Sequence, residues 1–266
     1  MSTSEITIGA DPELFLVNPD NNSLISAIDK FGGTKEVPVP LGIGDGYSVL
    51  EDNVMVEFNI PPASTADRFV EHIQKSLGKI EQKANQMGLD LSTLASGHFA
   101  LSELEDWRAW VFGCEPDYNA YTQKKNPKPE VETDPEFRTC GGHVHVGVDE
   151  LQDAPFEEIC RAVAFCDLHL GVPSMFFDKD TKRRERYGKA GAFRVKPYGF
   201  EYRTLSNFWI FHPDLIKWAY YGTQQAIKHY RSGFDLTPFY GDIQKAINDN
   251  DKSSQEFLIR HFNITV

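Results

Sequence analysis

Four short segments of this chain alternate apolar residues with chemically reactive ones, and the clearest is TCGGHVHVG, residues 139–147. Successive side chains of a β-strand point to opposite sides, so His143 and His145 share one face while Val144 and Val146 share the other. Glycines at both ends of the segment would allow another group to approach the backbone closely. The pattern therefore predicts a sheet that is packed on one face and polar on the other.

Two of the other segments carry carboxylates at the same spacing. In GADPE, Asp11 and Glu13 lie two residues apart and point to one face, although a solvated or edge strand would also explain them. In EDNVMVEFN, Glu57 lies in an otherwise apolar strand, where an unpaired buried carboxylate is costly, so it must face water or a cation. Glu51 would share the face of Glu57 if the strand continued without interruption, and its neighbour Asp52 competes for the same role.

A basic segment interrupts this acidic chain. Residues 179–196 hold eight basic and two acidic side chains, whereas the whole chain has 27 lysines and arginines against 39 aspartates and glutamates. Arginine suits bidentate phosphate binding. The arginines of the segment are Arg183, Arg184, Arg186 and Arg194. On the strand that follows, Glu201 and Arg203 share one face. A solvated loop and an ordinary ion pair are the simpler alternatives for these two features.

Composition argues against several classes of protein. The net charge of −12 and a pI near 5.1 disfavour nucleic acid and anionic membranes as main partners. The four cysteines form no CxxC pair, which favours reduced thiols over a disulfide framework. The start of the sequence lacks the basic and apolar regions of a signal peptide, and no apolar run reaches the length of a membrane span. We therefore expect a cytoplasmic protein.

The order of predicted elements indicates a single α+β domain over residues 1–266. Apolar spacing predicts helices over residues 64–88 and 153–171, and most of the last fifty residues also follow a helical pattern. Residues 31–48, rich in glycine and proline, and the polar residues 115–137 should form loops, and the second loop could act as a flap. Strands with polar motifs, separated by helices and long loops, are typical of α+β domains.

The reactive residues together suggest one kind of chemistry. They form an oxygen-rich set with one or two imidazoles, and the carboxylates are Asp11, Glu13, Glu51, Glu57 and Glu201. Such a set suits magnesium or manganese better than zinc. Arginines beside these ions suit a polyphosphate, and phosphoryl transfer requires this combination of divalent ions and fixed positive charge.

The order of these motifs resembles the glutamine synthetase and glutamate–cysteine ligase superfamily. The motifs are GxDxE, E…EFNxPP, GGHVHVG, RR…YGKAGAFR and EYRTLSNFW, over roughly residues 6–210. The closest resemblance is to the compact carboxylate–amine ligase branch of bacteria and phages. It implies a curved, mostly antiparallel sheet with flanking helices, whose concave face holds two or three magnesium or manganese ions around the phosphates of ATP.

The resemblance also implies roles for individual residues. The implied metal ligands are Asp11, Glu13, Glu51, Glu57, His143 and Glu201. The residues implied near ATP are His145, Arg183, Arg184, Arg186, Arg194 and Arg203. Arg194 and Arg203 would act on the transferred phosphoryl group. Asp11 is one methylene shorter than the glutamate of the large synthetases, so it would reach its metal less directly or through water.

The expected reaction is ATP-dependent formation of an amide or peptide-like bond. ATP would phosphorylate a carboxylate substrate, and an amine substrate would attack the acyl phosphate. Three alternatives remain at this point: a phosphotransferase of the same superfamily that acts on a guanidino or amino group, a metal-dependent hydrolase, and a non-catalytic protein with a ligase-like fold. The chain is much shorter than glutamine synthetase, so the ring-shaped oligomer of that enzyme is not assumed.

Overall fold

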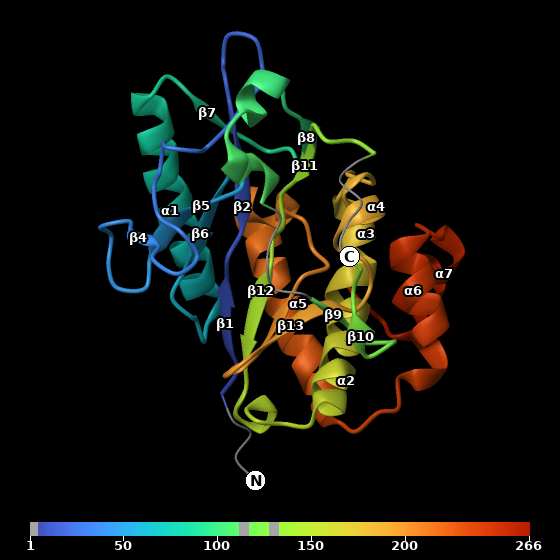
Figure 1. Cartoon of the computed structure of the whole chain (residues 1–266). Helices are drawn as coiled ribbons and strands as arrows, with labels where there is room; N and C mark the ends of the chain where they lie inside the picture. The colour runs from blue at the N-terminus through green and yellow to red at the C-terminus, as the bar shows by residue number, and fades with distance from the viewer. Residues whose placement is uncertain (1–4, 112–116, 128–132) are drawn as a thin grey trace.

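The computed structural model describes residues 5–111, 117–127 and 133–266. It confirms an α+β fold in which antiparallel sheets lie among helices (Figure 1). The first sheet contains, in spatial order, β1 (Thr7–Ala10), β12 (Val144–Gly147), β14 (Gly199–Tyr202), β13 (Ala192–Lys196), β9 (Tyr118–Asn119) and β10 (Lys124–Lys125). The second contains β3 (Leu24–Ile25), β2 (Glu13–Val17), β6 (Met55–Asn59), β5 (Ser48–Asp52) and β4 (Val39–Pro40), with β7 (Asp90–Ser92) paired to β2. A separate pair consists of β8 (Ser96–His98) and β11 (Phe137–Thr139).

Helices flank the sheets on both sides of the molecule. They are α1 (Ala66–Gln86), α2 (Phe156–Cys166), α3 (Val172–Phe177), α4 (Arg183–Arg186), α5 (Pro213–Arg231), α6 (Tyr240–Asn248) and α7 (Lys252–His261). Figure 1 shows α1 beside β5 and β6 at one side, and α6 and α7 at the opposite side. The α1 helix begins after Thr65, whose side chain accepts the Arg68 N–H as an N-cap, within the range that the sequence predicts.

One short segment belongs to both large sheets. β1 lies at the edge of the first sheet and β2 lies within the second, and only Asp11 and Pro12 separate these strands. Pro12 has no N–H to donate, but its carbonyl accepts the Phe58 N–H at 3.1 Å and so keeps the chain attached to β6. The carboxylates of Asp11 and Glu13 are therefore placed at the junction of the two sheets.

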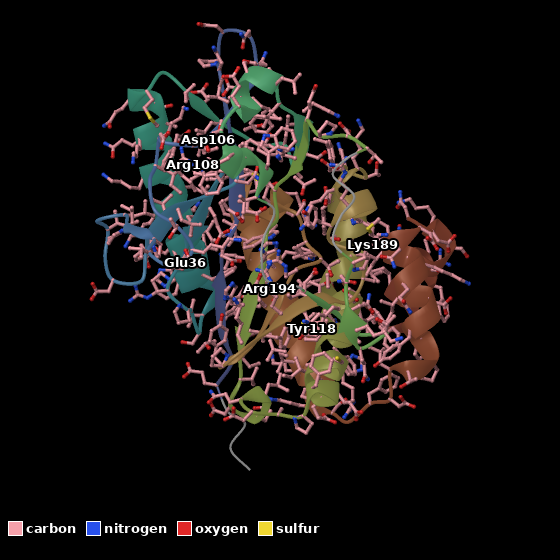
Figure 2. All side chains as sticks on the ribbon, viewed as in Figure 1. Glu36, Asp106, Arg108, Tyr118, Lys189 and Arg194 are labelled. Carbon is pink, nitrogen blue, oxygen red and sulfur yellow. The ribbon has the colours of Figure 1, made fainter. Side chains whose placement is uncertain are left out.

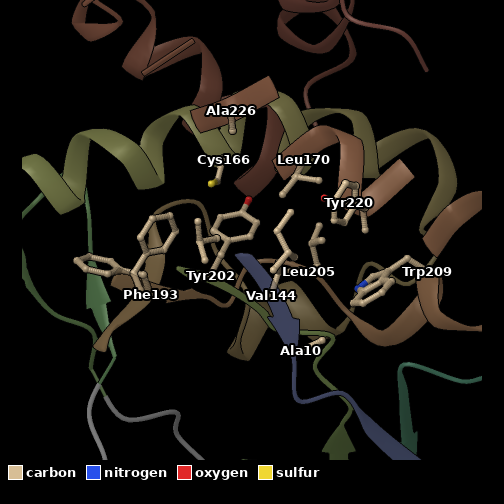
Figure 3. Close-up of a cluster of buried hydrophobic side chains, with 14 of the residues drawn as sticks. Ala10, Val144, Cys166, Leu170, Phe193, Tyr202, Leu205, Trp209, Tyr220 and Ala226 are labelled. Atoms are coloured by element: carbon tan, nitrogen blue, oxygen red, sulfur yellow. The ribbon is translucent and has the colours of Figure 1, made fainter. Parts of the chain in front are cut away.

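The apolar face of the first sheet packs beneath α2 and α5. Figure 3 shows Val144, Phe193 and Tyr202 from the strands close to Ala226 of α5. Val144 and Val146 have no exposed surface, as the alternation in the histidine strand predicts. Because this face is buried, the alternate residues of the same strands are directed to the other, polar face.

The predicted helix over residues 153–171 begins three residues later, at Phe156, and continues beyond the predicted end to Phe177. This run contains α2, a π-helical turn (Asp167–Gly171) and α3. Its length and composition would allow it to cross a membrane, but 83% of its apolar window is buried inside the protein. The run is therefore a core helix, and it covers β13 and β14.

The two predicted loops differ in structure. Residues 31–48 are mostly irregular, as predicted, and contain only the short strand β4 before β5 begins. The predicted flap instead supplies the β9–β10 hairpin to the edge of the first sheet, and ends at β11. Two parts of the predicted flap, residues 115–116 and 128–132, lie outside the described residues.

Candidate active site

A row of polar side chains crosses the first sheet from strand to strand. His145 of β12 pairs with Gly9 of β1 and with Glu201 of β14, and Glu201 pairs with Arg194 of β13. Directly paired residues in an antiparallel sheet share a face and lie about 5 Å apart. Arg194 lies in the middle of the molecule (Figure 2). The row is thus fixed by backbone register rather than by flexible loops.

A first cluster of possible metal ligands forms where this row meets the junction of the sheets. The ligand atoms of Asp11, His145 and Glu201 all lie within 4.8 Å of one another. His145 Nε2 is 3.0 Å from Asp11 Oδ2, and His143 Nδ1 is 3.4 Å from Asp11 Oδ1 and 3.6 Å from Glu201 Oε1. Both imidazoles of the histidine segment therefore reach the same carboxylates.

The charges of the first cluster are balanced by neighbouring cations. Burial opposes ionisation of Asp11, but His145 and His143 hold the pKa of its carboxyl well below the usual range. Burial also opposes ionisation of Glu201, but the Arg203 guanidinium and both histidines lower its pKa to about 2. These two carboxylates are therefore ionised at neutral pH and can bind a cation.

A second cluster lies in the other sheet. Glu13 of β2 pairs directly with Glu57 of β6, and Glu57 pairs with Leu50 of β5. Asp52 lies two residues after Leu50 and so shares this face. The ligand atoms of Glu13, Asp52 and Glu57 all lie within 4.8 Å of one another. This arrangement brings three carboxylates together.

The second cluster holds more negative charge than its one neighbouring lysine, Lys35, can offset. Burial, reinforced by the negative charges of Asp11, Asp52 and Glu13, raises the pKa of the Glu57 carboxyl well above its usual value. Ionising Glu57 is therefore unfavourable unless a cation binds nearby. A divalent ion would supply that charge.

The sequence-based role for Glu51 as a metal ligand is wrong. The strand does not continue from Glu51 to Glu57, because β5 and β6 form a hairpin that turns after Asp52. Glu51 therefore points away from the cluster, where its carboxylate accepts backbone N–H groups from Asp29 to Gly32 at 2.6–3.0 Å. Its neighbour Asp52 takes the place beside Glu57.

Three of the four arginines of the basic segment, which were expected to bind ATP, contact carbonyls or a carboxylate of the protein instead. Arg183 donates to the carbonyls of Thr204 and Arg203, and it is 3% exposed. Arg184 pairs with Asp178 at 3.0 Å. Arg186 donates to the carbonyls of Asp134 and Phe137.

These contacts hold the segment in place, so the expectation that Arg183, Arg184 and Arg186 bind phosphate is not supported. The physical reason is that a guanidinium carries several donors in a fixed fork and can hold two carbonyls at once. Arg194 and Arg203 do reach the polar face. Arg203 pairs with Glu201 and lies 3.2 Å from His143 Nδ1, and Arg194 Nη1 lies 3.7 Å from Glu201 Oε1.

The glycines beside the histidines leave room for neighbouring groups of the protein. A Cβ on Gly141 would overlap the His143 ring, and one on Gly142 would overlap the Ser206 carbonyl and the Trp209 ring nitrogen. The space is therefore occupied by the protein itself rather than left for metal or nucleotide.

Two lysines and a tyrosine at the site were not predicted. Lys196 Nζ lies 2.9 Å from Glu201 Oε2, and its position two residues after Arg194 on one strand was a usable signal. Tyr198 hydrogen-bonds His145 Nδ1 and stacks on its ring. Lys35 Nζ lies 2.9 Å from Asp52 Oδ2, a contact that no local spacing rule would predict.

The residues present fit divalent metal ions. Asp11 Oδ1 and His145 Nε2 are buried and lie close together, yet neither makes a hydrogen bond of good geometry with the described residues. Buried polar atoms without hydrogen bonds are costly unless a ligand satisfies them. Carboxylate oxygens with one imidazole are the donors that magnesium and manganese accept.

Comparisons with known proteins match parts of the chain to two ligase families. A family model described as "Phage phiEco32-like COOH.NH2 ligase-type 2" matches residues 135–262, and one described as "Glutamate-cysteine ligase family 2" matches residues 7–170. No curated protein matches the chain. A solved structure titled "Apo GmaS without ligand" is similar at 14% identity and a TM-score of 0.43, over 86% of this chain and 55% of that one. The chain thus spans little more than half the length of that structure.

The glutamate–cysteine ligase model covers more than half of the chain, including both carboxylate strands and the histidine strand. The other model extends over β13 and β14, which carry Arg194 and Glu201, and over Arg203, which follows β14 directly. The chain belongs to glutamate–cysteine ligase family 2, a family of carbon–nitrogen ligases.

Proposed function

We propose that this protein is an ATP-dependent carboxylate–amine ligase that uses magnesium or manganese. The observation that carries the proposal is the placement of two carboxylate clusters on either side of Pro12, with Arg194 and Arg203 beside the first. The substrates would be ATP, a carboxylic acid and an amine. The acidic chain, at a net charge of −12, does not favour a nucleic acid or an anionic membrane as partner, and we expect it to act in the cytoplasm.

Each of the two clusters would hold one metal ion. Asp11, His145 and Glu201 would hold one ion, with His143 beside them, and Glu13, Asp52 and Glu57 would hold another. When bound, these ions would neutralise phosphate oxygens and so favour attack by a carboxylate on ATP. The sheet register fixes these side chains in advance, which lowers the cost of assembling the site.

Arg194 and Arg203 would stabilise the phosphoryl group during transfer. Both are held by Glu201, so their guanidinium groups need little reorganisation when negative charge shifts toward them. Transfer of the terminal phosphoryl group to the carboxylate would release ADP and leave an acyl phosphate. Attack by the amine would then form the amide and release phosphate.

The test uses hydroxylamine in place of the unknown amine. Purified protein is incubated with ATP, magnesium, hydroxylamine and pools of carboxylic acids, and ADP, phosphate and hydroxamate are measured. A ligase should form all three in equal amounts, and only when a carboxylate is present. Glu13→Gln should abolish the reaction, whereas Glu105→Gln, the same change at an exposed position, should not.

Other products would overturn the proposal. ADP with a phosphorylated amine and no free phosphate would indicate a phosphotransferase. Metal-dependent hydrolysis that does not require ATP would indicate a hydrolase. A thermal-shift measurement tests ATP binding independently. ATP at a hundred times its Kd should stabilise the protein by about 2.7 kcal/mol in the presence of magnesium.

A further inference from the structure

Lys35 occupies the second cluster although it comes from a loop outside both sheets. Its ammonium lies 2.9 Å from Asp52 Oδ2, with 41% of the lysine side chain and 17% of the aspartate side chain exposed. Partial burial works against the charge of Lys35, but Asp52, Glu57 and Glu13 together raise its pKa. Lys35 therefore interacts with all three carboxylates of the cluster.

The loop that carries Lys35 is firmly anchored, and Glu51 is its main anchor. The Glu51 carboxylate accepts the four consecutive N–H groups from Asp29 to Gly32. Arg108 binds both carboxylate oxygens of Asp29 at 2.9 Å and also pairs with Asp106 (Figure 2).

The backbone beside Lys35 is fixed as well. Gly33 has a φ of +83°, and a Cβ there would press on the Val49 carbonyl at 2.9 Å. Glu51 and Asp52 are adjacent residues on opposite faces of β5, so one holds the loop and the other receives its lysine. The anchored loop places Lys35 beside the cluster, and the ammonium is carried on a flexible four-carbon side chain.

A divalent ion and this ammonium would compete for the same carboxylate. An ion bound to Asp52 would lie about 2.0–2.6 Å from its oxygen, so the Lys35 ammonium would remain within roughly 5 Å of a doubly positive ion. Like charges at that distance repel strongly in a partly buried site. Both cations cannot keep their favoured positions.

We propose that Lys35 is a competing cation of the second cluster, which partly offsets the negative charge of Glu13, Asp52 and Glu57 in the metal-free protein and leaves Asp52 when a divalent ion binds. This inference rests on the proposed metal-dependent function. It adds that Lys35 lowers the affinity of the second cluster for a divalent ion. The anchored backbone means that the side chain moves while residues 29–33 stay in place.

Manganese binding to ATP-free protein, followed by electron paramagnetic resonance, tests the proposal. Lys35→Met should bind manganese about tenfold more tightly than the parent, because the competing charge is gone. Lys30→Met removes the same charge from the same loop and should leave the affinity unchanged. Glu57→Gln should remove the class of manganese sites that Lys35→Met tightens.

A second measurement reports how accessible the Lys35 amine is. Acylation of Lys35 by an amine-reactive reagent, measured by mass spectrometry, should increase when manganese is added to the parent protein. Lys30 should show no such change. Two outcomes would overturn this inference but not the proposed function. One is manganese affinity that is equal or weaker in Lys35→Met than in the parent. The other is Lys35 acylation that manganese does not increase. Failure of the parent to bind manganese at all would overturn the proposed function with it.

Discussion

At the scale of single residues, strand alternation gives neighbouring carboxylates opposite roles. Glu51 and Asp52 differ by one position and one methylene, yet Glu51 caps four backbone N–H groups and Asp52 faces the second cluster. A one-residue step along a strand always reverses the face. The same rule explains why Val144 is buried while His143 and His145 flank Asp11.

Substitutions at these two positions should therefore separate stability from metal binding. Glu51→Gln should lower the free energy of unfolding by about 1–3 kcal/mol, because backbone N–H groups lose a charged acceptor. Asp52→Asn should leave metal-free stability nearly unchanged but remove the stabilisation that manganese gives. Urea denaturation with and without manganese measures both effects. Similar losses of stability in the two variants would contradict the assignment.

The glycine before His143 gives a second residue-scale prediction. Gly142→Ala should destabilise the protein by about 2–4 kcal/mol, because its Cβ would overlap the Ser206 carbonyl and the Trp209 ring, and backbone cannot easily move away. Gly78→Ala is the matched control: it lies in α1 with nothing within 4 Å, and should stabilise by up to about 1 kcal/mol. Thermal denaturation of both variants distinguishes packing from ligand access, and equal effects would argue against the packing explanation.

At the scale of elements, one carboxylate in the π-helical turn after α2 is hydrogen-bonded to four other segments. Asp167 is fully buried and accepts hydrogen bonds from Tyr202, Tyr121, Thr204 and the Gly191 N–H at 2.6–3.2 Å. These donors belong to β14, to the β9–β10 hairpin, and to the segments that lead into β13 and out of β14. Asp167 thus fixes the strands that carry Arg194, Glu201 and Arg203 against the core helix.

This carboxylate should make stability depend on pH. Burial raises the pKa of Asp167 to about 6, and its hydrogen-bond donors only partly offset this effect. The folded state therefore holds the proton more tightly than the unfolded state, so the contribution of this group is full below pH 4 and is lost as the pH rises through 6. The shift corresponds to about 3 kcal/mol.

Asp167→Asn should abolish this dependence. The free energy of unfolding of the parent minus that of the variant should be larger at pH 4.5 than at pH 7. Urea titrations at both values measure it, with the exposed Asp249→Asn as control. A difference that does not vary with pH, or that grows toward pH 7, would show that Asp167 is already ionised in the fold.

At the scale of the whole molecule, the two large sheets share a short connection and one hydrophobic cluster. β1 and β2 belong to different sheets but are joined by two residues, and one hydrophobic cluster includes Ile8 and Leu14 from these strands together with Phe69 of α1 and Trp209. We propose on this basis that residues 1–266 form one domain.

Unfolding should therefore be a single cooperative transition. Circular dichroism at 222 nm reports mainly the helices. Tryptophan fluorescence reports Trp209 in the core, Trp218 packed against it, and Trp107 and Trp110 near the surface. Urea midpoints from the two signals should coincide. Two separated midpoints would show that the sheets fold as distinct domains.

The sequence by itself determined the local features of this protein, which are its strands, its helix α1 and the order of its motifs. Period-two alternation predicted the strands that carry His145, Glu57 and Glu201 and the burial of Val144 and Val146, because alternation depends only on backbone geometry. It did not predict that Asp11 and Glu13 lie in different clusters. The sequence also predicted α1 from apolar spacing and an N-cap. The order of motifs identified the family that the comparisons show.

Only the tertiary structure decided which of these residues meet. The β5–β6 hairpin excluded Glu51 and selected Asp52, and the anchoring of α4 turned Arg183, Arg184 and Arg186 inward. Lys35 reaches Asp52 through a loop whose path is set by four hydrogen bonds to Glu51. Contacts between residues far apart in sequence depend on turns, register and packing of the whole chain, and local spacing carries no information about them.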